Sequence, residues 1–242
     1  MCGRYSITAR ASDLVAEFDI GLVVDEPRQS WNVAPTQQVP VIVEREPRGD
    51  EPESLHPVRQ LKAMRWGLVP SWAKNPKIGS RMINARSETL TEKPSFRSAA
   101  ARRRCILPAA GFYEWQTENG KKLPYFLHDP QNPILAFAGL YELWPNPDID
   151  DEDQRWLWTC TVITRPATDA LGHIHDRTPV IIPSDSRDDW LDCTPGSQGI
   201  ADDLLRAIPD PHLEPYRVST AVNSVRNNGP ELLEPVDEDR LF

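Results

Sequence analysis

ILAFAGLYELW (residues 134–144) and WLWTCTVIT (residues 156–164) are the two stretches that decide the fold class. Both are almost entirely apolar and rich in aromatic or β-branched residues, which favours strands. The segment between them, PNPDIDDEDQ (residues 145–154), is acidic and contains two prolines, as is typical of a connection at the surface. We therefore predict two adjacent strands that are joined by an acidic hairpin tip.

Further strands are predicted on both sides of this hairpin, with only short helical segments between them. The pattern predicts one α+β domain over residues 1–242, with a mainly antiparallel or mixed sheet curled into a barrel-like core and helices at its periphery. The predicted strands are 41–43, 61–68, 105–107 continued by 111–115, 122–128 and 180–182; the predicted helices are 11–19, 94–104, 185–191 and 200–207; residues 217–225 are predicted to be extended.

The composition favours a soluble, cytoplasmic protein with a packed core. The chain has 242 residues, of which 39% are hydrophobic, and eight of them are Trp. We find no signal peptide and no apolar run of membrane-spanning length. The four cysteines are far apart in the sequence and form no CxxC pair, so neither a zinc ribbon nor a disulfide framework is predicted.

Positive charge is concentrated in one segment of an otherwise acidic chain. The net charge is −9, yet residues 59–104 contain twelve Lys or Arg against two Glu, a local charge of +10 that leaves −19 for the remainder. Such asymmetry is typical of a protein with one anion-binding face. Trp66 and Trp72 lie in the same segment, and exposed aromatics beside cations can stack on unpaired bases. A basic nucleic-acid surface is predicted here, in preference to dispersed charges that only increase solubility.

The second residue, Cys2, would carry both an α-amine and a thiol if Met1 were removed. Their reference pKa values are about 8 and about 8.5, so both groups are partly deprotonated near neutral pH. Such an aminothiol can capture an aldehyde and close to a thiazolidine, or act as an N-terminal nucleophile in hydrolysis. Taken alone, an incidental cysteine at a frayed terminus is the simpler interpretation.

Two further positions have side chains suited to proton transfer. Glu114 stands among Phe112, Tyr113 and Trp115 on a predicted strand, where burial would raise the pKa of its carboxyl, although a solvent-facing position is equally compatible with the sequence. His173 and His175 have strand spacing, but the other histidines offer no matching set of ligands. We therefore expect an acid or base rather than a metal site, and no cofactor.

Six motifs in order along the chain resemble those of the SOS response-associated peptidase (SRAP) family, whose members are also called abasic-site processing proteins. The match extends from residue 2 to about residue 235. The motifs are Cys2-Gly3-Arg4-Tyr5, Asn32-Val33-Ala34-Pro35-Thr36, Arg65-Trp66-Gly67-Leu68-Val69-Pro70, Asn84-Ala85-Arg86-Ser87-Glu88-Thr89, Gly111-Phe112-Tyr113-Glu114-Trp115 and His175-Asp176-Arg177.

The resemblance implies an SRAP domain with a basic channel for single-stranded DNA, in which mature Cys2 captures the aldehyde of an abasic site as a thiazolidine crosslink. Single-stranded DNA, including junctions with duplex, is the implied partner; we expect a monomer that is nucleoid-associated when on DNA. The implied catalytic residues are Cys2 as nucleophile, Asn84 orienting the N-terminal residue and the sugar, Glu114 assisting Schiff-base formation, and His175 as the acid or base that opens the sugar ring. The implied DNA contacts are Arg4, Arg86 and Arg177 at phosphates, Trp66 stacked beside the lesion, and Thr164.

Two features depart from the family pattern, and two other activities stay open. Thr178 stands where family members often have Met, and the acidic stretches 45–57 and 145–154 look like insertions. The first alternative activity is an N-terminal-nucleophile or cysteine peptidase that removes its own Met1. The second is a single-strand DNA binder that forms no covalent bond and in which Cys2 is incidental.

Overall fold

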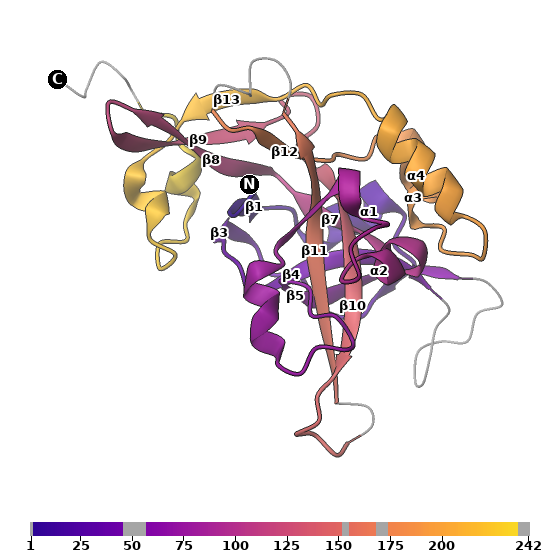
Figure 1. Ribbon diagram of the computed structural model, residues 1–242. Coiled ribbons are helices and arrows are strands. Elements are labelled where there is room, and N and C mark those ends of the chain that lie inside the picture. Colours follow the sequence, from indigo (N-terminus) through magenta and orange to yellow (C-terminus); the bar gives the residue numbers. More distant parts are fainter. Residues whose placement is uncertain (1, 46–56, 152–154, 168–173, 237–242) are drawn as a thin grey trace.

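The computed structural model describes residues 2–45, 57–151, 155–167 and 174–236 (Figure 1). Its larger sheet closes on itself, because β11 pairs with β10 on one edge and with β5 on the other. The closed barrel consists of five strands, β5-β4-β7-β10-β11, and confirms the predicted α+β fold with a barrel-like sheet. In spatial order the sheet contains β12 (Arg177–Pro179), β11 (Trp156–Pro166), β10 (Leu135–Pro145), β7 (Arg104–Ala109), β4 (Gln38–Arg45), β5 (Val58–Trp66) and β2 (Leu22–Val23), with β6 (Asn84–Arg86) beside β11.

The predicted hairpin between the two apolar stretches is confirmed as β10 and β11. They pair in antiparallel register from Gly139 opposite Val162 to Pro145 opposite Trp156, and their far end projects from the barrel (Figure 1). Residues 135–140 are buried without a break, because β10 has strands on both sides and the core beneath it. Residues 152–154 of the acidic tip and 46–56 of the other acidic stretch lie outside the described residues.

A second, antiparallel sheet packs beside the barrel and carries the amino-terminal strand. It contains β13 (Glu214–Arg217), β9 (Lys121–His128), β8 (Gly111–Glu118), β1 (Tyr5–Ile7) and β3 (Ser30–Val33). The prediction that residues 111–115 continue the preceding strand is wrong, since the chain bends at Ala110 and enters this second sheet. Gly111 permits the change of sheet, because a Cβ there would overlap Phe126 and the carbonyl of Leu127 on β9.

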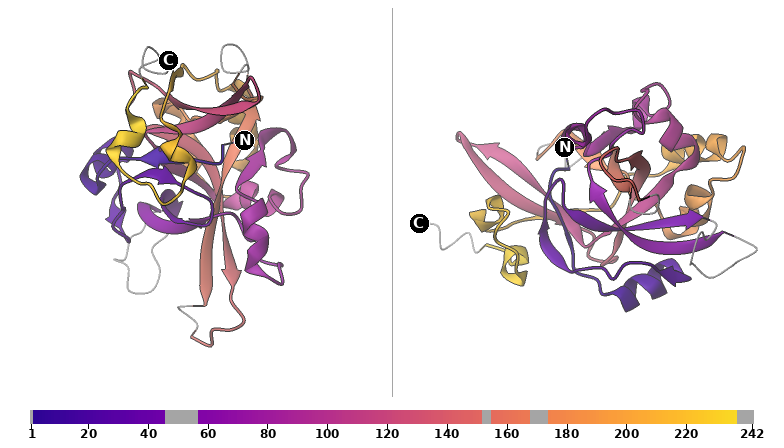
Figure 2. Two further views of the ribbon diagram at one scale, coloured as in Figure 1. Left: turned by 90° about the vertical axis from the view of Figure 1, so that its left-hand side faces the viewer. Right: turned by 90° about the horizontal axis from the view of Figure 1, so that it is seen from below.

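Short helices cover the outside of the two sheets. The α-helices are α1 (Ala11–Phe18), α2 (Arg97–Arg102), α3 (Arg187–Leu191) and α4 (Gln198–Ala207); the 3-10 helices are η1 (Pro76–Arg81), η2 (Ser87–Thr89), η4 (Ser184–Ser186), η5 (Thr220–Asn223) and η6 (Pro230–Leu233). Viewed along the hairpin, α3 and α4 lie on one side of the barrel and the carboxy-terminal turns on the other (Figure 2). Within the part of the chain described, no helix is long and apolar enough to cross a membrane.

The predicted extended segment 217–225 is mostly incorrect. β13 ends at Arg217, and the chain then turns through η5, where the Ser219 side chain accepts a hydrogen bond from Ala221 N–H. The Asn32 amide stabilises these turns by donating to the carbonyls of Val222, Ser224 and Asn227. Long-range hydrogen bonds from a distant strand therefore decide the local conformation, and they are not visible in local sequence.

Candidate active site

Pairing of β1 with β8 places the amino-terminal residues beside Glu114. The antiparallel register continues beyond β1, because Tyr113 N–H donates to the Arg4 carbonyl at 2.9 Å. Arg4 thus lies opposite Tyr113. Moving one residue back along the first strand and one forward along β8 puts Gly3 opposite Glu114. Cys2 immediately precedes Gly3 and therefore lies close to Glu114.

Cys2 is completely buried and is held by a side chain from the barrel. Asn84 on β6 donates from Nδ2 to the Cys2 carbonyl at 2.8 Å, and β6 is itself fixed by parallel pairing with β11. Burial raises the pKa of the Cys2 thiol, and the nearby Glu114 carboxylate raises this pKa further. The thiol is therefore protonated at neutral pH and needs a base before it can act as a nucleophile.

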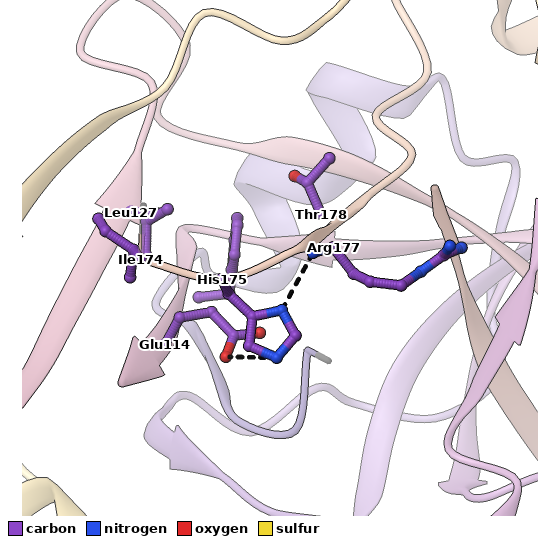
Figure 3. Close-up of a pocket in the computed structure, with 7 residues that line it drawn as sticks. Glu114, Leu127, Ile174, His175, Arg177 and Thr178 are labelled. Carbon is purple, nitrogen blue, oxygen red and sulfur yellow. Dashed lines mark hydrogen bonds and ion pairs between the residues drawn. The ribbon is translucent and has the colours of Figure 1, made fainter. Parts of the chain in front are cut away.

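Glu114 has a carboxyl that can act as such a base, and it faces the imidazole of His175. The residue is 4% exposed, and burial raises its pKa to about 7. Its Oε2 atom lies 4.0 Å from Nε2 of His175 (Figure 3). A carboxyl with this pKa populates both protonation states near neutral pH, so it can take up and return a proton within one reaction. The structure places Glu114 in the site and not on a solvent-facing edge.

His175 is half-buried, and its ring orientation is fixed by the next residues of the chain. Arg177 N–H donates to His175 Nδ1 at 3.0 Å, and Asp176 Oδ1 lies 2.9 Å from the same nitrogen. Burial lowers the pKa of His175, which favours the neutral ring. In the tautomer whose Nδ1 accepts from Arg177, the single ring proton is on Nε2, the nitrogen that faces Glu114. His173, the other member of the predicted pair, lies outside the described residues.

Glu114 and His175 lie in a small open hollow with apolar walls, and Cys2 is not among the residues that line it. The residues that line the hollow are Phe112, Glu114, Leu127, Ile174, His175, Arg177 and Thr178. A thiol, a carboxyl with a pKa near neutrality and a neutral imidazole form a set suited to nucleophilic addition and proton transfer. Among the residues that the structure describes, no group of three or more His, Cys, Asp or Glu is arranged to hold a metal ion.

A model of the SOS response associated peptidase (SRAP) family matches residues 1–225, which include all of these site residues. The chain belongs to this family. Among the SRAP relatives, abasic site processing protein YoqW of Bacillus subtilis is 40% identical over 237 residues, covering 97% of this chain and 99% of YoqW. Abasic site processing protein HMCES of Gallus gallus is 35% identical, covering 87% of this chain and 67% of HMCES.

Solved structures show the same fold for the SRAP chain. The crystal structure of a protein from Bacteroides thetaiotaomicron superposes with a TM-score of 0.76 at 23% identity, covering 97% of this chain and all of the other. Another from Bordetella bronchiseptica gives a TM-score of 0.71 at 25% identity, with 90% of this chain covered. The barrel and its flanking sheet are thus an arrangement shared with these proteins.

The structure corrects the predicted role of Trp66 as a DNA contact. It was predicted to stack beside the lesion, but its side chain is completely buried against Tyr5, and its indole N–H donates to the Ile83 carbonyl at 2.9 Å. A base cannot reach this ring in the described conformation. Trp72, in the same basic segment, is 61% exposed and is the residue available for stacking.

Arg177 and Thr164 lie at the site but contact each other. Thr164 is 1% exposed, and its hydroxyl accepts from Arg177 Nε at 3.2 Å. Arg177 is buried as well, with 8% of its surface exposed, and it forms an ion pair with Glu88. Neither is open to solvent, so a phosphate would have to displace internal partners to reach Arg177. Thr164 acts here as an internal acceptor.

The other two predicted arginines differ in exposure. Arg86 is exposed at the end of β6. Arg4 is half-buried and donates from Nη1 to Asn32 Oδ1 at 2.7 Å and to the Val222 carbonyl at 2.8 Å. Arg4 thereby joins the amino-terminal strand to the carboxy-terminal turns, a link that its motif alone does not reveal.

Two residues of the site had no role assigned from the sequence. Glu88 lies within a quoted motif and pairs with Arg177, but only the fold brings these residues together across 89 positions. Thr178, noted as a departure from the family pattern, is 3% exposed and lines the hollow. Its small side chain is therefore part of the wall beside His175.

Proposed function

We propose that this SRAP protein captures abasic sites in single-stranded DNA as a thiazolidine formed by Cys2 after loss of Met1. The observation that carries the proposal is the placement of buried Cys2, held by Asn84, beside the facing pair Glu114 and His175. Relatives that share the family and up to 40% of the sequence are named abasic site processing proteins. A nucleophile at an amino terminus and an acid–base pair are the groups that aldehyde capture requires.

The reaction proceeds in three balanced steps. The Cys2 α-amine adds to the ring-opened sugar aldehyde, forming a C–N bond and moving one proton from nitrogen to the new hydroxyl. The carbinolamine then loses that hydroxyl as water and becomes an imine. Finally the Cys2 sulfur adds to the imine carbon, and the thiol proton is transferred to nitrogen. The product is the sum of protein and DNA less one water, without oxidant or cofactor.

Glu114 and His175 supply the protons that these steps need. Protonated Glu114 can donate to the departing hydroxyl, and its carboxylate can then accept the thiol proton as the ring closes. During ring opening, His175 can donate its Nε2 proton to the sugar ring oxygen while the anomeric hydroxyl gives its proton to the Glu114 carboxylate. Glu114 then returns that proton to His175, so both side chains end as they began. The 4.0 Å between Nε2 of His175 and Oε2 of Glu114 is too long for a direct hydrogen bond.

Exposed cations and one indole provide the DNA surface. Trp72 is followed along the chain by Lys74 and by Lys77 and Arg81 of η1, all of which are exposed. An exposed indole close in sequence to exposed cations suits single strands, because bases can stack on the ring while phosphates contact the charges. Since every group invoked belongs to one chain, the proposal requires no second copy.

Removal of Met1 by the site itself is a second candidate activity. The bond to be cut is the Met1–Cys2 peptide, whose amide nitrogen belongs to a residue fixed by Asn84 and placed beside Glu114. The family model also bears the description peptidase. Incubation of pure precursor that retains Met1 tests this activity: self-removal requires that Met1 is lost without added aminopeptidase and that Glu114→Gln stops the loss.

The capture proposal is tested with a single-stranded oligonucleotide that carries one abasic site. Protein confirmed to begin at Cys2 is expected to give a band that survives denaturant, while Cys2→Ala gives none. A Cys2→Ala protein that retains abasic DNA as strongly as the parent, together with absence of any covalent band from the parent, would establish non-covalent binding and overturn the proposal.

A further inference from the structure

Glu88 and Arg177 form a bidentate ion pair at the edge of the site. Arg177 Nη1 lies 2.7 Å from Glu88 Oε1, and Nη2 lies 2.9 Å from Oε2. Such fork-to-fork geometry fixes both side chains more firmly than a single contact would. The hydrogen bonds from Arg177 lower the pKa of Glu88 to about 2, so the carboxylate is ionised throughout the neutral range.

The remaining donors of the same guanidinium bind Thr164 on β11. Nε donates to the Thr164 hydroxyl at 3.2 Å, and Nη2 donates to the Thr164 carbonyl at 2.6 Å. Arg177 is thus held between η2 on one side and β11 on the other. The backbone of Arg177 is fixed as well, because it begins β12 and pairs opposite Pro166.

That backbone carries the N–H on which the His175 ring depends. Arg177 N–H is a donor 3.0 Å from His175 Nδ1, whereas Asp176 Oδ1, at 2.9 Å from the same nitrogen, is an acceptor. One nitrogen cannot accept from Arg177 and donate to Asp176 at the same time. The position of Arg177 N–H relative to the ring therefore decides between two protonation patterns of His175.

We propose that Glu88 is a positioning residue that, by bracing Arg177 against Thr164, keeps Nδ1 of His175 as an acceptor and the ring proton on Nε2, facing Glu114. Without the brace, the start of β12 is freer to move, and Asp176 competes for a proton on Nδ1. The inference rests on the proposed function for its catalytic meaning, since only aldehyde capture gives the Nε2 proton a role. Its structural part, the tautomer of His175, stands independently.

The tautomer is tested in the whole protein without DNA. Nitrogen NMR of protein labelled at its five histidines, with the His175 signals assigned through His175→Gln, reports which ring nitrogen carries the proton. The parent is expected to show His175 protonated on Nε2 alone, and Glu88→Gln is expected to show proton occupancy on Nδ1. Identical His175 signals in parent and Glu88→Gln would overturn the inference.

Kinetics separate positioning from a loss of stability. For Glu88→Gln we expect the limiting rate of crosslinking to fall about tenfold, a part of the about 10²–10⁴-fold that a general acid–base group contributes. The DNA concentration for half-maximal rate should not rise, because the variant removes a negative charge. Glu88→Asp, which keeps the carboxylate, should recover most of the rate.

Glu142→Gln is the matched control. Glu142 lies on β10, outside the site, and forms an ion pair with Arg103 at 2.7 Å. If Glu142→Gln slows crosslinking as much as Glu88→Gln does, or if Glu88→Asp is no faster than Glu88→Gln, Glu88 is only a stabilising residue and the inference fails. If the parent itself forms no crosslink, the proposed function fails, and the NMR measurement still decides the role of Glu88.

Discussion

Nε2 of His175 faces Oε2 of Glu114 across 4.0 Å. Glu114 lies on β8, and His175 lies 61 residues later in the segment before β12. Both groups have pKa values moved by burial in the direction that favours their neutral forms: upward for the carboxyl and downward for the imidazole. Two neutral partners beside a protonated thiol form a site ready for proton transfer.

Glu114 should make the stability of the protein fall as pH rises. Its pKa moves from 4.5 to about 7 on folding, so the folded state binds the proton more tightly. The stabilisation is complete below about pH 4.5 and is lost as pH rises through about 7, a decrease of at most about 3 kcal/mol. Urea unfolding of the parent and of Glu114→Gln at pH 5 and pH 8 measures this effect. The parent should lose stability relative to the variant between these values; an equal change in both would contradict the assigned burial effect.

Trp72, and not Trp66, should contribute to binding of single-stranded DNA. Trp72→Ala is expected to weaken binding of an undamaged oligonucleotide by about 1–3 kcal/mol, because one stacked base is lost. Trp66→Phe should leave this affinity unchanged and lower the melting temperature, since the buried indole loses its hydrogen bond to Ile83. Fluorescence anisotropy at fixed salt measures both. The opposite ranking of affinities would restore the original assignment of Trp66.

Arg86 should contribute a phosphate contact that depends on salt and not on sequence. The side chain is exposed at the end of β6, next to the residues of the site. Arg86→Ala is expected to reduce the slope of log affinity against log salt by about 0.7 for a single strand, because one fewer counterion is released. A salt titration of two unrelated oligonucleotides should give the same reduction for both. An unchanged slope would remove Arg86 from the DNA surface.

Arg104 should be essential to stability although it has no role in the proposed chemistry. It is 1% exposed, and its guanidinium donates to the carbonyls of Trp190, Ala100, Ala101 and Asp192 and to the Ser197 hydroxyl. Arg104→Met removes these donors and should destabilise the protein by about 3 kcal/mol or more, because several buried acceptors lose their partner. Denaturant unfolding with the exposed Arg102→Met as control checks this. Equal stabilities of the two variants would show that the buried network is not needed.

Local sequence patterns predicted the parts of the fold that are determined by the spacing of neighbouring residues. The apolar stretches of β10 and β11 and the helix at Ala11–Phe18 follow directly from hydrophobic spacing. The change of sheet at Ala110 and the turns after Arg217 depend on contacts with Phe126 and Asn32. Those partners are distant in sequence, so no local pattern reports them.

The residues of the candidate site could be predicted from the sequence, but the exposure of their side chains mostly could not. Glu114 and His175 were predicted from their neighbours and motifs, and the fold brings them together. The exposure of the two tryptophans could not be read from the sequence, because Trp66 and Trp72 share the same charged surroundings. Barrel closure decides between them: Trp66 lies at the end of β5, where that strand pairs with Cys160 of β11, and Trp72 lies in the loop beyond.

The most direct measurement of the central claim is a count of free thiols in the crosslinked protein. The chain has four cysteines, so the denatured, uncrosslinked protein should take up four alkyl groups from iodoacetamide. The adduct with abasic DNA should have the mass of protein lacking Met1 plus DNA less one water, and should take up only three, because the Cys2 sulfur is in the thiazolidine ring. An adduct of the same mass that takes up four would be an imine with a free Cys2 thiol, and would contradict the account.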